Sequence, residues 1–178
     1  MANNKHLDYR TEDERMGFSK PLARHRVTLY VDPQTLSTAQ QKGEKPYIGR
    51  DGKPYVRHFV KTKVERSRNS LERAIRAAFP VVTRPPDAEH PWKVVAIYRY
   101  HPKDLKRYML GQYRTKAPDV DNLAKDLLDC ITNTGVAWKD DRQVVIAAIV
   151  KQYVRSMDEP AHIELRISQL KKPVKKGK

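Results

Sequence analysis

The sequence predicts an α+β fold, in which one mixed β-sheet carries two main helices within a single domain. Segments with the composition of strands and segments with helical periodicity are mixed along the chain without strict β-α-β repetition. A length of 178 residues suits one domain with a sizeable core. We expect this domain to span residues 25–170, between a polar extension at 1–24 and a basic tail at 171–178.

The first elements are short segments rich in β-branched and aromatic residues. Arg26–Val31 (RVTLYV) has the composition of a strand. The polar stretch Gln34–Lys45 predicts a surface loop. Pro46–Ile48 and Tyr55–Phe59 flank Asp51–Gly52, and because Asp-Gly is a strong turn signal, these pieces predict a β-hairpin.

A helix is predicted over Lys61–Phe79, followed by a proline-punctuated linker from Pro80 to Pro91. The apolar residues of this helix recur at the spacing of a buried helical stripe, as expected for a helix packed on a sheet. That stripe consists of Val64, Leu71, Ile75 and Ala78. The opposite face is basic and carries Lys63, Arg66, Arg68, Arg73 and Arg76.

Three further strands complete the expected sheet. Trp92–Tyr100 (WKVVAIYRY) and Gln143–Val154 (QVVIAAIVKQYV) are rich in β-branched and aromatic residues. Ala161–Ile167 alternates polar and apolar residues, as a half-exposed strand should. Since Asp158–Pro160 has the composition of a turn, we expect the last two strands to pair as a hairpin.

The second helix lies in the segment 117–144, which also holds the most unusual polar residues of the chain. Its apolar stripe comprises Leu123, Leu127, Cys130 and Ile131. Asp121 and Lys125 lie one turn apart on the polar face. Pro118 marks the entry to the helix, and Asn133–Gly135 predicts its end.

Two acidic pairs flank this helix: Asp119 with Asp121 before it, and Asp140 with Asp141 after it. Clusters of carboxylates bind hard cations such as Mg²⁺, which can activate a water and neutralise a phosphoryl oxygen. Lys125 is placed to contact the phosphate or stabilise the leaving oxygen. The alternative is structural: aspartates cap helices, Lys125 pairs with Asp121, and the second pair lies in a solvated turn.

The spacing of the whole string resembles the RusA family of Holliday-junction resolvases. The matching residues are Asp119, Asp121, Asn122, Leu123, Lys125, Asp129, Gly135, Trp138, Asp140, Asp141, Gln143 and Val144. The resemblance implies a small homodimeric endonuclease that depends on Mg²⁺, with Mn²⁺ as a substitute, and cuts four-way DNA junctions symmetrically. It implies catalytic, metal-binding aspartates at Asp119, Asp121 and Asp141 and a catalytic lysine at Lys125. Asp140 and Asn122 would support this site.

The charge of the chain favours a nucleic acid as its partner. Lys and Arg number 36 against 21 Asp and Glu, which gives a net charge of +15. The stretch 101–116 interleaves cations with tyrosines and leads straight to the acidic pair, a pattern that suits phosphate contact and stacking. An ordinary solvated surface is the alternative. We expect DNA contacts from Lys103, Lys106, Arg107, Arg114 and Lys116, and from Arg73 and Arg76 on the first helix.

Other classes of protein fit the sequence less well. A single cysteine, Cys130, and the lack of Cys/His metal spacing argue against disulfides and zinc. The longest apolar run, Val144–Val150, is far shorter than a membrane span, and no signal peptide is visible, so we expect a cytoplasmic protein without membrane contact. The resemblance to the RusA family implies a bacterial host cell, with the gene carried by the host or by a phage. Two alternative functions remain: a non-catalytic basic nucleic-acid-binding protein that keeps the fold, and a phage structural or packaging protein.

Overall fold

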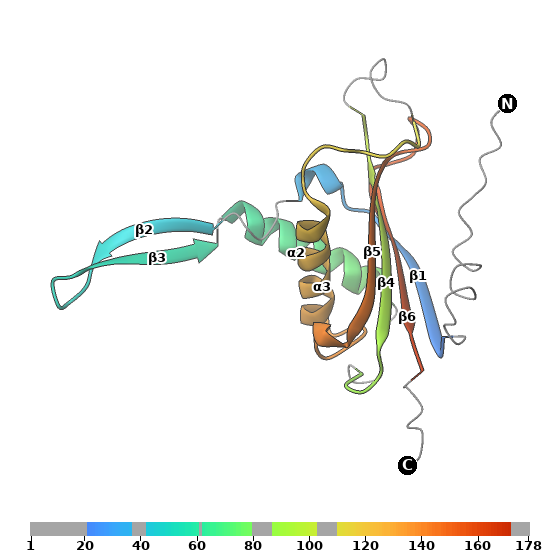
Figure 1. The fold of residues 1–178 in the computed structure, drawn as a ribbon. Coiled ribbons are helices and arrows are strands. Elements are labelled where there is room, and N and C mark those ends of the chain that lie inside the picture. The colour runs from blue at the N-terminus through green and yellow to red at the C-terminus, as the bar shows by residue number, and fades with distance from the viewer. Residues whose placement is uncertain (1–20, 37–41, 61, 80–86, 103–109, 172–178) are drawn as a thin grey trace, which may run out of the picture.

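The computed structural model describes residues 21–36, 42–60, 62–79, 87–102 and 110–171. These residues form a four-stranded mixed sheet, two helices and a separate two-stranded hairpin (Figure 1). The predicted α+β class is therefore confirmed. The expected extension and basic tail lie almost wholly outside the described residues.

The sheet is built around one central strand. Its order is β1 (Ala23–Leu29), β6 (His162–Gln169), β4 (Trp92–Tyr100) and β5 (Val144–Tyr153). β4 pairs antiparallel with β6 and parallel with β5. Every residue of β4 except Lys93 is buried, which agrees with its nearly continuous apolar sequence.

The prediction that the last two strands pair as a hairpin is wrong. β4 lies between β5 and β6, and β6 pairs with β1 on its other side. The eight residues from 154 to 161 are long enough to carry the chain past β4 rather than turn it back. Apolar β4 gains more by burial at the centre than by a position at the edge, so the local turn signal does not decide the pairing.

Two helices, α2 (Thr62–Ala78) and α3 (Val120–Thr134), lie on the same side of the sheet (Figure 1). Both predicted apolar stripes are confirmed, because α2 buries Val64, Leu71 and Ile75 and α3 buries the four residues Leu123, Leu127, Cys130 and Ile131. Gly135 ends α3 in the left-handed conformation (φ 67°), and its N–H donates to the carbonyls of Ile131 and Thr132. Neither helix is long and apolar enough to cross a membrane, as judged over the residues that the structure describes.

The hairpin of β2 (Lys42–Ile48) and β3 (Pro54–Val60) forms a sheet of its own. Its existence is as predicted, although β2 begins four residues earlier, within the stretch expected to be a loop. β3 leads directly into α2, and the hairpin projects from the helical side of the molecule, away from the sheet (Figure 1). Two short 3₁₀ turns, η1 (Pro33–Thr35) and η2 (Asp141–Gln143), complete the described elements.

Asp87 joins the start of β4 to the end of β6. Its carboxylate accepts hydrogen bonds from the backbone N–H groups of Glu89 and His90, from the Trp92 indole and from the Gln169 amide, at 3.0–3.2 Å. Burial acts to raise the pKa of Asp87. Hydrogen bonds from His90, the Glu89 N–H and Gln169 outweigh that effect and lower the pKa to about 2.

The main chain of Asp87 extends this connection to the segment after α3. Its N–H donates to the Ala137 carbonyl (2.9 Å), and the Lys139 N–H donates to its carbonyl (2.8 Å). Trp138, fully buried between these two, stacks at a tilt with its ring centroid 5.9 Å from that of Trp92. Asp87 therefore fixes the chain immediately before Asp140 and Asp141.

We predict that Asp87→Asn lowers the free energy of unfolding at pH 7 by about 2 kcal/mol. The pKa of Asp87 is lower in the folded protein than in the unfolded chain, so the ionised carboxylate stabilises the folded state. In the parent protein this contribution is present above pH 4 and is lost as the pH falls towards 2. Urea unfolding between pH 5 and pH 2 should therefore show a shallower decline for the variant. Asp158→Asn, an exposed residue, is the control, and equal slopes for all three proteins would contradict the assignment.

Candidate active site

The first acidic pair stands at the start of α3. Asp119 is the N-cap residue, with extended backbone (φ −73°, ψ 154°), but its side chain makes no capping hydrogen bond. Asp121 lies in the first turn, and both side chains are exposed. Because an N-cap aspartate ordinarily accepts from the N–H groups of the first turn, capping does not account for Asp119. Both carboxylates face solvent, where a ligand can reach them.

Lys151, on β5, holds the backbone that leads into this pair. Its ammonium group donates to the carbonyls of Lys116 (2.9 Å) and Pro118 (2.7 Å). Burial and the nearby Arg114 guanidinium lower the pKa of Lys151, whereas Asp119 acts in the opposite direction. The cation therefore ties the N-terminus of α3 to the C-terminal half of β5.

Arg114 makes a second attachment to the same stretch of backbone. Its guanidinium donates to the carbonyls of Lys116 (2.7 Å) and Ala117 (2.5 Å) and lies 4.2 Å from the centroid of the Tyr100 ring. These contacts favour a positioning role for Arg114 over the DNA contact that its place in the basic stretch predicts. Sequence alone does not distinguish the two, because a cation can serve a carbonyl or a phosphate equally well.

The two residues of the second acidic pair, Asp140 and Asp141, lie in different environments. Asp140 caps η2: its carboxylate accepts from the Arg142 N–H (2.9 Å) and pairs with the Arg142 guanidinium (2.9 Å). Gln143 completes a capping box by accepting from the Asp140 N–H. The Arg142 contacts lower the pKa of Asp140. Asp141, the next residue, is exposed, whereas Asp140 is engaged by Arg142 and Gln143, so the supporting role of Asp140 stays a prediction.

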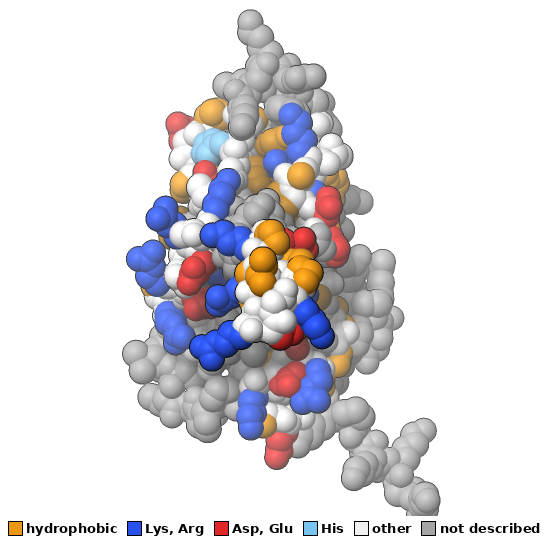
Figure 2. Space-filling view, turned by 90° about the vertical axis from the view of Figure 1, so that its left-hand side faces the viewer, with side chains coloured by type: hydrophobic (Ala, Val, Ile, Leu, Met, Phe, Trp, Pro, Cys, Tyr) orange, Lys and Arg blue, Asp and Glu red, His pale blue; other side chains and the backbone are white. Residues whose placement is uncertain are grey.

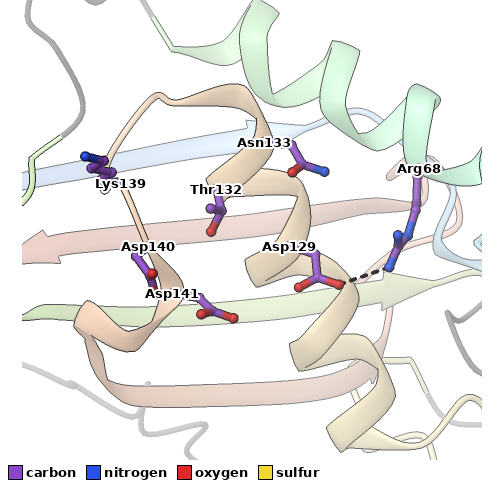
Figure 3. A pocket seen from close by; sticks show the side chains of 7 residues that line it. All are labelled: Arg68, Asp129, Thr132, Asn133, Lys139, Asp140 and Asp141. Carbon is purple, nitrogen blue, oxygen red and sulfur yellow. Dashed lines mark hydrogen bonds and ion pairs between the residues drawn. The ribbon is translucent and has the colours of Figure 1, made fainter.

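Asp141 lies on an open pocket of about 330 Å³ beside the C-terminal half of α3 (Figure 3). Across this pocket the side chain of Asp141 points towards α3, on which Asp129 stands (Figure 3). The lining is strongly polar and consists of Arg68, Asp129, Thr132, Asn133, Lys139, Asp140 and Asp141.

Arg68 of α2 fixes the acidic face of α3. Its guanidinium pairs with Asp126 (2.9 Å) and Asp129 (3.0 Å), and the Asp126 side chain is only 5% exposed. Burial raises the pKa of Asp126, Arg68 acts to lower it, and Asp129 adds to the rise. The arginine thus neutralises two carboxylates that would otherwise repel each other and an approaching phosphate.

The three aspartates expected to bind metal are not gathered at one point. Asp121 and Asp129 lie about 12 Å apart along α3, since eight residues rise 1.5 Å each, and Asp141 shares its pocket with Asp129. Across the described part of the chain, no three or more His, Cys, Asp or Glu side chains are grouped closely enough to hold a metal ion. The donors are of the right kind for Mg²⁺, but their positions here do not form a single ligand shell.

The remaining predicted residues fall into different environments. Lys125 is exposed on α3, one turn from Asp121, and Asn122 is half-buried beside it. Arg76 donates to the carbonyls of Thr134 (3.1 Å) and Asn133 (3.2 Å), which satisfies the C-terminal end of α3. Arg73 and Lys116 are exposed. Lys103, Lys106 and Arg107 lie outside the described residues.

Three residues that position the site were not identified from the sequence: Arg68 as the partner of Asp126, Lys151, and Asp87 as a link between strands. A charged residue inside an apolar strand is a usable signal for Lys151, because burial in a sheet demands a partner. No comparable signal marks Asp87, which stands in a polar stretch between prolines.

A comparison with protein-family models matches residues 23–168 with the family described as endodeoxyribonuclease RusA. The chain belongs to the RusA family. The match covers the whole four-stranded sheet but for Gln169, both helices and the hairpin. A comparison with curated individual proteins gives no significant match.

Membership of the RusA family makes this chain a Holliday-junction endodeoxyribonuclease. Its substrate is a phosphodiester in branched DNA, which agrees with the strongly basic composition of the chain. The excess of cations attracts such a polyanion.

We predict that Arg68→Met destabilises this RusA protein by about 3 kcal/mol, because it leaves the carboxylate of Asp126 buried without a cation. The loss should shrink at acidic pH, since protonated Asp126 needs no partner and its pKa rises further once Arg68 is gone. Urea unfolding at pH 7.5 and pH 4.5 measures both effects. The double change Arg68→Met with Asp126→Leu should recover most of the stability, and a double variant as unstable as the single one would contradict the pairing.

We predict that Lys151→Met reduces the turnover of junction cleavage about tenfold, because the backbone before Asp119 loses both contacts from the ammonium group. Junction affinity without metal should stay close to that of the parent protein. Single-turnover cleavage and metal-free binding separate the two quantities. Lys171→Met, an exposed lysine beyond β6, is the control, and an equal loss of affinity and turnover would point to a direct DNA contact instead.

Proposed function

We propose that Asp119, Asp121 and Asp141 are the catalytic carboxylates of this endonuclease and that Lys125 is its catalytic cation. The observation that carries this proposal concerns Asp119. It occupies the N-cap position of α3, but its exposed side chain makes no capping hydrogen bond. Lys151 and Arg114 bind the carbonyls of the backbone just before it. Asp141 is likewise exposed, because Asp140 supplies the cap of η2.

We propose Mg²⁺ as the cofactor, with Mn²⁺ as a substitute. Asp119 and Asp121 at the start of α3, and Asp141 beside η2, offer oxygen ligands of the kind that Mg²⁺ prefers, and binding the ion by all three would require them to come closer together than they lie in this structure. When bound, the ion supplies an activated water and charge neutralisation at the phosphate. The role of the chain itself is to hold the carboxylates on rigid supports, while Lys125 contacts the scissile phosphate or the leaving 3′-oxygen.

We propose further that the protein acts as a homodimer on four-way junctions, so that two equivalent sites nick two strands symmetrically. A cytoplasmic location in a bacterial cell, with the gene in the host or its phage, follows from where such junctions arise. The cations at Arg73 and Lys116 remain candidates for the DNA backbone, together with Lys103, Lys106 and Arg107.

The test is cleavage of a labelled four-way junction and of matched linear duplex in Mg²⁺. We predict paired nicks in the junction alone. Asp121→Asn should slow cleavage by at least about a thousandfold, because a metal ligand or reacting group is lost. The same change should leave the junction affinity without metal within about threefold of the parent value. Asp158→Asn removes the same charge from an exposed turn and should cleave as the parent does.

Tight junction binding by the parent protein without cleavage in Mg²⁺ or Mn²⁺ would overturn the catalytic proposal and favour a binding module. Full activity of Asp121→Asn would show that Asp121 is not a catalytic residue, while the proposed endonuclease activity of the protein would stand. Isothermal titration with Mn²⁺ gives an independent readout, because the saturable site should be lost in Asp121→Asn and kept in Asp158→Asn.

A further inference from the structure

The two faces of the β2–β3 hairpin differ in chemistry. Tyr47 is paired in register with Tyr55, and Lys45 is paired with Arg57. Residues two apart on a strand share a face, and so do direct cross-strand partners. One face of the hairpin therefore presents two aromatic rings and two cations, and all four side chains are exposed. The other face carries the apolar residues Pro46, Ile48, Pro54 and Val56, together with Glu44.

The aromatic pair is held in place by the turn. The Tyr47 and Tyr55 rings are stacked, with centroids 5.8 Å apart and planes inclined by 28°. The Tyr55 hydroxyl donates to the Asp51 carboxylate (2.7 Å), which raises the pKa of Tyr55 and lowers that of Asp51. A Cβ at Gly49 would stand 2.6 Å from the Tyr55 ring, so glycine lets the ring lie against the turn.

The two tyrosine rings on this hairpin do not pack into the hydrophobic core. Tyr47 and Tyr55 are 52% and 44% exposed, and their hairpin is a sheet separate from the main one. Figure 2 views the molecule from the side on which the hairpin projects and shows Lys and Arg side chains spread around apolar side chains at its centre. Aromatic rings beside cations on a projecting ribbon match the needs of a ligand with both flat bases and phosphates.

We propose that the face formed by Lys45, Tyr47, Tyr55 and Arg57 binds DNA at the branch point, where bases are exposed for stacking. The cations contact phosphates and the tyrosine pair stacks on a base; this inference rests on the junction substrate of the proposed function. At this face charge complementarity favours DNA over a second copy, because Lys45 and Arg57 attract a polyanion and would be repelled by the same face of another chain.

The first test uses the full-length protein and a four-way junction carrying 2-aminopurine at the branch, in EDTA to prevent cleavage. Tyr47→Ala and Gly49→Ala should weaken junction binding roughly 5- to 100-fold and reduce the fluorescence change of 2-aminopurine, since stacking on a base is lost. Tyr30→Ala removes a tyrosine next to β1 that is still more exposed, at 76%, and should bind as the parent does.

The second test separates charge from stacking. The double change Lys45→Gln with Arg57→Gln should reduce the slope of log affinity against log salt by about two, one for each lost phosphate contact. Arg24→Gln with Arg26→Gln removes two exposed cations from one face of β1 and should leave the slope close to that of the parent. Far-ultraviolet circular dichroism and urea unfolding confirm that every variant keeps the folded core.

Parent-like affinity, fluorescence and salt slope in all hairpin variants, while the parent binds and cleaves junctions, would overturn this inference and leave the proposed function standing. Failure of the parent protein to bind a junction would overturn both. Sedimentation velocity identifies the competing role: if Tyr47→Ala and Gly49→Ala convert a parent oligomer into a smaller species, the hairpin is an interface between copies and not a DNA contact.

Discussion

The parallel pairing of β4 with β5 is the constraint on which the arrangement of the site depends. Parallel neighbours cannot be joined by a tight turn, so the chain must cross from the end of β4 to the start of β5, and α3 is the crossover helix. Asp119 therefore occupies the N-cap position of α3, and Asp141 lies seven residues beyond the end of α3, in the short turn η2 that leads into β5. The acidic residues stand at opposite ends of one helix, with Lys125 between them on its exposed side.

Many polar residues around this crossover bind the main chain. Lys151 and Arg114 hold carbonyls before α3, Arg76 holds carbonyls at its end, and Asp87 binds the segment that follows. Each contact satisfies backbone groups that a loop or a helix end leaves without partners. The site is thus supported on both sides by side chains that never need to touch DNA, which is how exposed carboxylates on loops acquire fixed positions.

Sequence reasoning succeeded where the signal was local. The stripe from Leu123 to Ile131 and the stop at Gly135 follow from helical periodicity and left-handed glycine geometry, and both are confirmed. It failed for β5 and β6, because the pairing was settled by burial of β4 and not by the turn at Asp158–Pro160. Of the candidate site, the acidic residues could be named, since their spacing is local. Their mutual distances could not, because they depend on how a whole helix lies on the sheet.

The contacts of the basic residues could not be predicted from the sequence either. They differ between the basic residues near the acidic pairs and those on the β2–β3 hairpin. A basic residue near the acidic pairs has backbone carbonyls and carboxylates within reach, and Arg68, Arg76 and Arg114 are engaged by them. On the β2–β3 hairpin the cross-strand pairing occupies backbone groups, and the side chains of Lys45 and Arg57 are exposed. Net charge governs long-range attraction to DNA whatever the cations touch, but close contact with phosphates requires cations whose side chains are exposed. These exposed cations support the proposal that the projecting β2–β3 hairpin takes part in DNA recognition.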